Sequence, residues 1–309
     1  MAKTAGPSGL ITPVAHGDLA EMSLEGGEDR GLDSGTLKRM VIAAINAPGY
    51  KPPTLPDVVM QLMKIANDPN ANFSKVEKVV SSDPGIAAKI VATANSAFYA
   101  RGAKVESIHT AISRLGLSQL RDIAFQESVK ASVFRVPEYQ KRMTSERTHA
   151  LGAAMLAREI CKVVSIDADM AFLCGLLHDI GKPIIIGILT DLARKQKTKM
   201  LEESFIDGAI KEIHASLGGQ ICKLWGLPAP IIEAVELHHQ PCVGGKLIQL
   251  AALVGIANMC CHHAGIGCPR QPSDEKCEQA FQLLKVTPGQ VRQILNMAEN
   301  LAQASIDED

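Results

Sequence analysis

The sequence has almost no net charge, since 32 Lys and Arg residues face 33 Asp and Glu residues and the formal charge is -1. This balance gives no support for direct nucleic-acid binding, which commonly relies on a basic excess. The chain also lacks an apolar run close to the roughly 20 residues that cross a bilayer, and it has no charged start followed by an apolar core. We therefore expect no membrane contact and a cytoplasmic location.

The eight cysteines include no C-x-x-C pair and are spread through a chain of 309 residues. This distribution favours reduced thiols over a disulfide framework. One cluster, Cys260-Cys261-His262-His263 with Cys268 nearby, has metal-binding residue types. Its spacing is not the paired spacing of a structural zinc site, so we look for metal ligands elsewhere.

Long runs of alternating apolar and polar residues are missing between Pro52 and Phe134, where apolar residues recur instead at spacings of three and four. Asp83-Pro84 is typical of a helix start, because Asp accepts a hydrogen bond from the first turn and Pro suits its first position. With 46% hydrophobic and 21% charged residues, the composition is typical of a globular protein. We predict an all-α fold.

The length predicts about two domains. Residues 1–35 are rich in Gly, Ser, Asp and Glu, and we expect a flexible N-terminal arm there. Pro137 and the charged segment 138–147 mark a boundary between an N-terminal helical half, 36–140, and a second helical half, 141–305. We expect the two halves to pack on each other, because no Gly/Ser linker separates them.

His178 and Asp179 end an apolar helix, where a buried carboxylate needs a cation, a metal or hydrogen bonds. Other histidines fall on predicted inward helix faces. His149 lies four residues before Ala153, His214 is in the middle of an apolar stripe, and His238 and His239 continue another. Each one alone is typical of a core histidine held by hydrogen bonds, but together they suit a metal-capable pocket.

Several separated motifs resemble the HDOD family, the HD-related output domains of bacteria. The motifs are Leu55-Pro56, Asp83-Pro84-Gly85-Ile86-Ala87-Ala88-Lys89-Ile90, Asn95-Ser96-Ala97-Phe98-Tyr99, Ala111-Ile112-Ser113-Arg114-Leu115-Gly116 and Gly175-Leu176-Leu177-His178-Asp179-Ile180-Gly181. The resemblance covers roughly residues 48 to 260. It implies a multi-helix fold in which an N-terminal helical half packs on an HD-like half. It also implies a signalling role, in a family whose enzymatic activity is generally unestablished.

The chain also resembles the HD phosphohydrolase superfamily, which includes the HD-GYP phosphodiesterases. That resemblance implies these metal ligands: His149, His178, Asp179, His214, His238 and His239. Asn258 departs from the pattern, which usually has Asp there. A His-rich set with one carboxylate favours iron, manganese or zinc over calcium or magnesium. The Gly-Tyr-Pro motif of HD-GYP enzymes is missing after His239, where Gln240-Pro241 follows.

Three functions follow as hypotheses. The first is a bacterial signal-transduction HDOD protein with a metal- or ligand-binding pocket, an unidentified signalling partner and little or no catalytic activity. The second is a metal-dependent phosphohydrolase acting on a nucleotide or phosphate ester, in which Lys182 steadies developing charge. The third is an interaction scaffold whose histidines only form hydrogen bonds within the core.

Overall fold

The computed structural model describes residues 34–66, 73–99, 103–164, 166, 170–270 and 280–306, and nearly all of its regular structure is helical. This confirms the all-α prediction. The expected flexible arm, 1–35, lies almost entirely outside the described residues. The chain divides into two compact units, a smaller one of residues 53–132 and a larger one that joins residues up to Pro52 to those from Val133 onward.

The smaller unit is a set of short helices, namely α3 (Asp57–Ala66), α4 (Phe73–Ser81), α5 (Pro84–Ala94), α6 (Ile108–Leu115) and α7 (Leu117–Ser132). Helix α5 begins as predicted, because the Asp83 carboxylate accepts a hydrogen bond from the Ile86 backbone N–H at 3.0 Å and Pro84 follows the cap. Helix α3 packs against α7 and α4, and α6 packs against α4 and α5.

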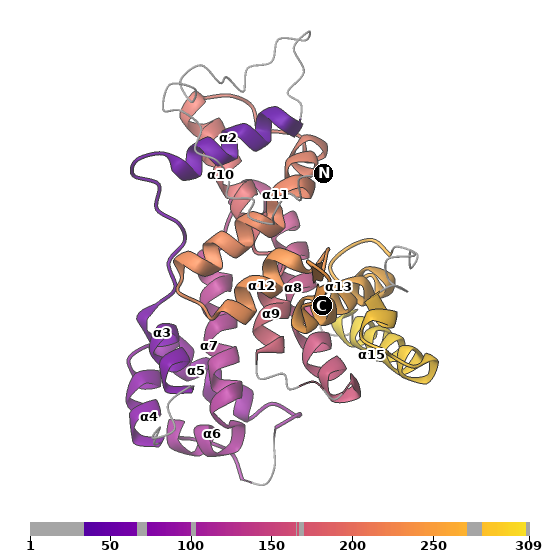
Figure 1. Ribbon diagram of the computed structural model, residues 1–309. Coiled ribbons are helices and arrows are strands. Elements are labelled where there is room, and N and C mark those ends of the chain that lie inside the picture. Colours follow the sequence, from indigo (N-terminus) through magenta and orange to yellow (C-terminus); the bar gives the residue numbers. More distant parts are fainter. Residues whose placement is uncertain are drawn as a thin grey trace. The chain divides into compact units, whose positions relative to one another are not determined.

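The larger unit contains α2 (Ser34–Asn46), the 3-10 turn η1 (Pro137–Tyr139), α8 (Gln140–Val164), α9 (Ala171–Leu177), α10 (Gly181–Gln196), α11 (Glu203–Leu224), α12 (Ala229–Leu237), α13 (Gln249–Ala264) and α15 (Pro288–Ile306). Strands β1 (Cys242–Val243) and β2 (Lys246–Leu247) form a small antiparallel hairpin. Helix α8 packs against α9 and α13, while α11 packs against α10 and α12 (Figure 1). These five helices, α8, α9, α11, α12 and α13, surround the predicted metal ligands.

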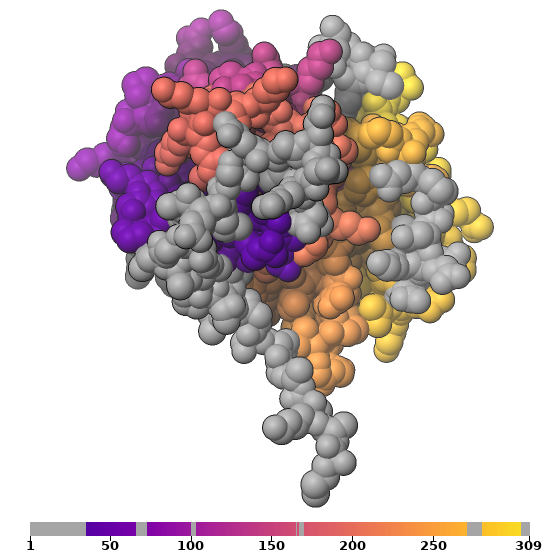
Figure 2. All heavy atoms as spheres, turned by 90° about the horizontal axis from the view of Figure 1, so that it is seen from above, coloured from indigo at the N-terminus to yellow at the C-terminus, as the bar shows by residue number. Residues whose placement is uncertain are grey.

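Helix α2 corrects the predicted domain boundary. The sequence analysis placed residues 36–140 in one half, but α2 packs on α10 and α11 of the larger unit, and indigo and salmon atoms lie together in Figure 2. Leu37, Met40 and Val41 are fully buried, and Lys38 Nζ lies 3.0 Å from Glu212 Oε2. The apolar periodicity of α2 showed that one face is buried but did not indicate which helices cover it.

The stretch Ala171–Gln196 has the length of a membrane span, 26 residues, and a mean hydropathy of 1.6. Within the protein, however, 89% of its most apolar window is buried. Its apolar character is therefore explained by its place in the core of the larger unit, where α9 and α10 are covered by α8 and α11.

Two glycines let helices approach closely around the turn between α9 and α10. A Cβ at Gly175 would lie 2.7 Å from the Ala153 carbonyl oxygen on α8. A Cβ at Gly181 would lie only 2.0 Å from the His214 carbonyl oxygen on α11. Both contacts are with backbone, which cannot rotate away as a side chain can. The α9–α10 turn is thus held between α8 and α11.

We expect Gly181→Ala to destabilise the protein by about 3 kcal/mol, because overpacking against backbone forces the helices apart. The measurement is the urea midpoint of unfolding. Gly187→Ala on the same helix is the matched control, since a Cβ there meets only Val136 Cγ2 at 3.8 Å. The free energy of unfolding of this control should stay unchanged or rise by up to about 1 kcal/mol, because Ala is more favourable than Gly in a helix interior. Equal midpoints for the two variants would contradict the close approach of α10 to α11.

Candidate metal centre

Asp179 lies in the turn between α9 and α10, with its side chain 5% exposed. Helix α9 ends at Leu177 and His178 is its C-terminal cap. The sequence analysis expected the apolar helix to end at His178 and Asp179, and the next helix, α10, begins at Gly181. The tight turn places Asp179 in the interior of the larger unit, where four histidines reach it.

The Nε2 atoms of the four histidines lie around the two carboxylate oxygens of Asp179. His178 Nε2 is 3.0 Å and His149 Nε2 is 3.7 Å from Oδ2. His214 Nε2 is 3.3 Å and His238 Nε2 is 3.7 Å from Oδ1. The structure thus brings together side chains from α8, the α9–α10 turn, α11 and the end of α12, as the sequence analysis expected for these residues.

Each of these rings is oriented by its other nitrogen, which faces a backbone carbonyl. The Nδ1 atoms of His178, His214, His238 and His149 lie 2.7, 2.7, 2.8 and 3.1 Å from the carbonyl oxygens of Gly175, Ile210, Val235 and Ile266. A carbonyl oxygen only accepts, so Nδ1 carries the proton and donates it. In a neutral ring the Nε2 lone pair is then bare and directed toward Asp179. Metal-binding histidines are oriented in this way.

His149, His214 and His238 are neutral at pH 7. Burial, with the neighbouring His178, lowers the pKa of His149 to about 3 and holds the pKa of His238 well below its usual value. Burial likewise lowers the pKa of His214. A neutral imidazole is the form that binds a metal ion, so these histidines are ready to act as ligands.

His239 differs from the prediction. The sequence analysis placed both His238 and His239 on the buried stripe, but helix α12 ends at Leu237, and His239 is exposed while His238 is buried. The His239 ring still turns toward the centre, and its Nε2 lies 3.0 Å from His214 Nε2. Because His214 Nε2 is bare, His239 donates this hydrogen bond. His239 therefore borders the centre on its solvent side.

Four buried atoms of the centre have no hydrogen-bond partner among the described residues, namely His178 Nε2, His238 Nε2, Asp179 Oδ1 and Asp179 Oδ2. The 3.0 Å between His178 Nε2 and Asp179 Oδ2 is a hydrogen-bond distance, but the angle is not that of a hydrogen bond. Lone pairs that face a carboxylate repel it unless a cation lies among them. Ligand atoms of Asp179, His214, His238 and His239 also lie within 4.8 Å of one another. The donor set fits a divalent metal ion.

Lys182 supplies the permanent positive charge at this centre. Its Nζ lies 2.5 Å from Asp179 Oδ2 and 3.8 Å from Glu146 Oε2, and Glu146 in turn accepts a hydrogen bond from Arg142. Burial would raise the pKa of Asp179, but His178 and Lys182 more than offset this and hold that pKa well below its usual value. Asp179 is therefore ionised, and Lys182 would compete with a metal ion for it.

Asn258 lies within the centre and contacts His149. Its Oδ1 is 2.9 Å from His149 Nε2, and it is 5% exposed. Both nitrogens of His149 thus face oxygen atoms, although a neutral ring has only one N–H. The amide is turned so that Nδ2 donates to Nε2, or a cation lies between Nε2 and Oδ1, or Nε2–H donates to Oδ1 in the tautomer whose Nδ1 is bare. In each case Asn258 brings no negative charge.

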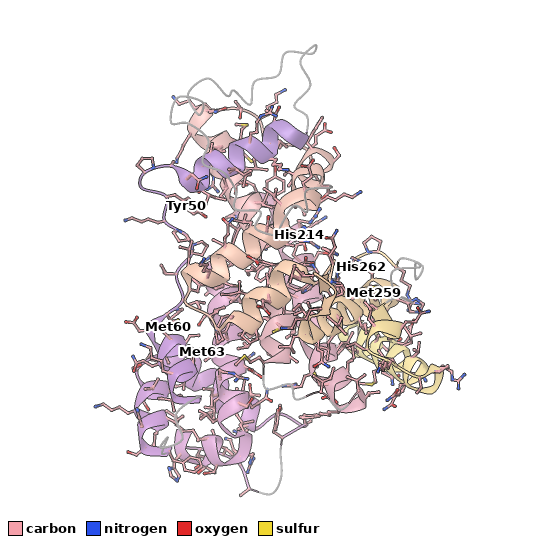
Figure 3. The ribbon with its side chains drawn as sticks, viewed as in Figure 1. Tyr50, Met60, Met63, His214, Met259 and His262 are labelled. Carbon is pink, nitrogen blue, oxygen red and sulfur yellow. The ribbon has the colours of Figure 1, made fainter. Side chains whose placement is uncertain are left out.

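Two further side chains lie beside His149 that the expected ligand set did not include. His149, His262 and Cys268 offer ligand atoms within 4.8 Å of one another. His263 instead points toward Glu299, with His263 Nε2 3.9 Å from Glu299 Oε1. The sequence showed the cluster of His and Cys types, but only the folding of the chain after α13 selects these two members. Figure 3 labels His214 on α11 and His262 on α13.

Solved structures share this fold. An HDOD domain protein of unknown function from Geobacter sulfurreducens is 24% identical, with a TM-score of 0.61, over 88% of this chain and 93% of its own. A proposed metal-dependent phosphohydrolase from Shewanella amazonensis is 20% identical, with a TM-score of 0.64, over 88% and 98%. A proposed signal transduction protein from Marinobacter aquaeolei is 21% identical, with a TM-score of 0.62, over 93% and 66%. At these identities the likeness shows the fold alone.

Curated relatives match parts of the chain. An uncharacterised protein from Treponema pallidum is 22% identical over 215 residues, which are 67% of this chain and 41% of that protein. Ribonuclease Y from Mycoplasmoides gallisepticum is 27% identical over 133 residues, which are 41% of this chain and 21% of that protein. The chain thus spans less than half the length of these relatives.

The family is shown by a longer match. Residues 53–241 match the HDOD domain, and this range runs from α3 of the smaller unit through α12 of the larger one. It includes His149, His178, Asp179, His214, His238 and His239. The range covers more than half of the chain and agrees with the shared fold, so the chain belongs to the HDOD domain family.

Proposed function

We propose that this chain is a bacterial cytoplasmic signal-transduction protein whose larger unit binds a divalent metal ion and has little or no catalytic activity. The observation that supports it is a group of buried atoms without a hydrogen-bond partner, namely His178 Nε2, His238 Nε2 and Asp179 Oδ1, beside the Asp179 Oδ2 that pairs with Lys182. Hydrogen bonds alone leave this group unsatisfied at a cost of about 1–3 kcal/mol for each atom. A metal ion among them would satisfy these three atoms together.

Iron, manganese or zinc suits the donor set best. His149, His178, His214, His238 and His239 would hold the ion or ions with Asp179, and Asn258 could add only a carbonyl oxygen. Calcium and magnesium favour sites made of oxygen atoms, whereas imidazole nitrogen suits first-row transition ions and zinc. The backbone carbonyls that hold the Nδ1 atoms add to the affinity by fixing each ring.

Metal occupancy is a suitable signal because the ligands come from several helices. His149 lies on α8, His214 on α11 and His238 at the end of α12, while Asp179 lies between α9 and α10. An ion that binds only when these helices are in place stabilises that arrangement. We propose that this stabilised surface of the larger unit is what a signalling partner recognises. The proposed signal transduction protein from Marinobacter aquaeolei, which shares the fold, is consistent with such a role.

Weak catalysis follows from the charges of the ligand set. Asp179 is its single carboxylate, and Lys182 already lies 2.5 Å from it. A hydrolase with two metal ions relies on anionic ligands that hold both ions and on an activated water molecule. Asn258 is in the place where an added carboxylate would contribute that charge, and it contributes none.

The alternative is a metal-dependent phosphohydrolase acting on a nucleotide or phosphate ester. The similarity to Ribonuclease Y of Mycoplasmoides gallisepticum favours it, as does the half-buried ammonium group of Lys182 beside the centre. A bound divalent ion would supply polarisation of the phosphate group. Lys182 would then turn from Asp179 to a phosphate oxygen, and the exposed edge at His239 would admit the substrate.

We expect His238→Gln to lower the affinity of the chelator-stripped protein for Mn²⁺ by at least about tenfold, because the variant keeps most of the volume but loses the bare Nε2. Equilibrium dialysis with untagged protein measures this. His109→Gln is the matched control, because His109 is an exposed histidine of the smaller unit. The Mn²⁺ affinity of this variant should equal that of the wild type. Unchanged affinity in His238→Gln and in His214→Gln would show that the ligand set is wrong.

We expect the wild-type protein loaded with Fe²⁺, Mn²⁺ or Zn²⁺ to give no turnover above background on a panel of phosphomonoesters, phosphodiesters and nucleotides. Asn258→Asp should raise the Mn²⁺ affinity about tenfold, because it adds an anionic ligand. Asn258→Ala, which removes the amide without adding charge, is the control and should not raise it. Efficient wild-type turnover would favour the phosphohydrolase. Activity that arises only in Asn258→Asp would show that catalysis lacks a negative charge at position 258.

We expect Lys182→Met to have opposite effects on the stripped and the loaded protein. Without metal, Asp179 loses its cation, and stability should fall by roughly 3 kcal/mol, the low end for a broken buried pair because Lys182 is 17% exposed. Mn²⁺ affinity should rise, since the competitor for Asp179 is gone. Thermal melting with and without Mn²⁺ measures both effects. Lys162→Met, which alters an exposed lysine, is the control. Loss of Mn²⁺ affinity in both Lys182→Met and Lys162→Met would contradict the competition of Lys182 with the metal ion for Asp179.

A further inference from the structure

The chain folds back onto α8 directly after α13. Gly265 and Gly267 have φ values of 78° and 64°, and a residue with a side chain would be strained in this left-handed conformation. A Cβ at Gly267 would lie 2.4 Å from the backbone nitrogen of His149 and 2.4 Å from the Ser145 carbonyl oxygen, so this turn packs tightly against α8. The Ser145 hydroxyl donates to the Gly267 carbonyl at 2.5 Å. These contacts hold Cys268, the next residue, beside His149.

The Cys268 thiol lies between two imidazole rings. Its Sγ is 3.2 Å from His262 Nδ1 and 3.8 Å from His149 Nδ1. The centroids of the two rings are 4.8 Å apart. In tetrahedral zinc coordination, with bonds of about 2.3 Å to sulfur and 2.0–2.1 Å to nitrogen, a sulfur and a nitrogen ligand are about 3.6 Å apart. The two observed distances lie on either side of this value.

We propose that His149, His262 and Cys268 form a second metal site, separate from the Asp179 centre, that takes a thiophilic divalent ion such as Zn²⁺. The two nitrogens and one sulfur suit zinc and leave a fourth position for water. His262 and Cys268 are half-buried, so an ion can reach them from solvent. Binding forms a sulfur–metal bond and releases the thiol proton to solvent.

The surroundings of the thiol do not favour a reactive free thiolate. Burial raises the pKa of Cys268 to about 11, although the Lys182 charge works against this rise. The thiol therefore keeps its proton at pH 7 until an ion displaces it. The nearby histidines stay neutral and available, because burial lowers the pKa of His262 as it does that of His149.

His149 belongs to both sites but can serve only one ion at a time. A neutral ring has one bare nitrogen, and Nε2 faces Asp179 while Nδ1 faces Cys268. Asn258 Oδ1, 2.9 Å from Nε2, can accept the proton of the tautomer in which Nδ1 is bare. An ion at Cys268 thus withdraws His149 from the Asp179 centre. This competition rests on the proposed metal binding at Asp179, whereas the Cys268 site itself does not.

Titration of the chelator-stripped full chain with Co²⁺ tests the second site, because a cobalt–thiolate bond gives a charge-transfer absorption in the near ultraviolet. We expect this absorption in the wild type and its loss in Cys268→Ser. His262→Gln should lower the Co²⁺ affinity by at least about tenfold. Cys242→Ser, which alters an exposed cysteine outside the cluster, is the matched control and should keep the absorption. Zn²⁺ should displace the cobalt.

The absorption should also persist in His238→Gln, which alters only the Asp179 centre, so failure of that centre and failure of this site are distinguishable. No thiolate absorption in folded wild type, or equal absorption in Cys268→Ser, would overturn the second site and leave a thiol–imidazole hydrogen bond only. Circular dichroism checks folding, and Cys268→Ala replaces Cys268→Ser if the latter fails to fold. Because Zn²⁺ also competes directly for the Asp179 centre, the sharing of His149 predicts that Zn²⁺ lowers the Mn²⁺ affinity further in wild type than in Cys268→Ser; an equal fall in both would overturn the sharing of His149.

Discussion

A buried, ionised carboxylate is the constraint on which the larger unit depends. Asp179 is 5% exposed, and the rings around it direct bare nitrogens rather than N–H groups toward it. This orientation is not local chance, because each Nδ1 is held by a backbone carbonyl of the surrounding helices or of the turn after α13. Side chains from within α8 and α11 and from the ends of α9 and α12 therefore converge on one polar site that a cation would satisfy.

The balance of charge separates binding from catalysis in this site. Imidazole ligands would bind a transition ion without neutralising its charge, and Asp179 alone provides a negative charge. Lys182 reduces that charge further by lying 2.5 Å from the carboxylate. Asn258 keeps the shape of a carboxylate ligand and contacts His149, but it carries no charge. This composition supports the proposal that the site holds an ion rather than activating water on a phosphate ester.

His149 connects the two faces of the site. It lies on α8, contacts Asn258 of α13 with one nitrogen, and contacts the turn after α13 with the other. Because the two nitrogens of a neutral imidazole differ in protonation, the ring links the chemistry of Asp179 to that of Cys268 without movement of the backbone. The close packing of Gly267 against α8 keeps this geometry fixed.

Much of this protein follows from the sequence alone. Apolar periodicity predicts the helices, Asp83 and Pro84 mark a helix start, and the burial of His149, His178, His214 and His238 follows from their place on apolar stripes. These features depend on residues within one or two helical turns of each other. His239 was placed wrongly because α12 ends before it, so the helical period no longer applies.

Contacts between distant segments were decided only by the tertiary structure. Helix α2 packs with the larger unit rather than with the segment that follows it, and Cys268 meets His149 across 119 residues of chain. Periodicity states which face of a helix is buried, but it does not state which element covers that face. The ligand types were therefore visible in the sequence, whereas the tautomers, the competition of Lys182 and the neighbours of Cys268 depend on how the helices pack.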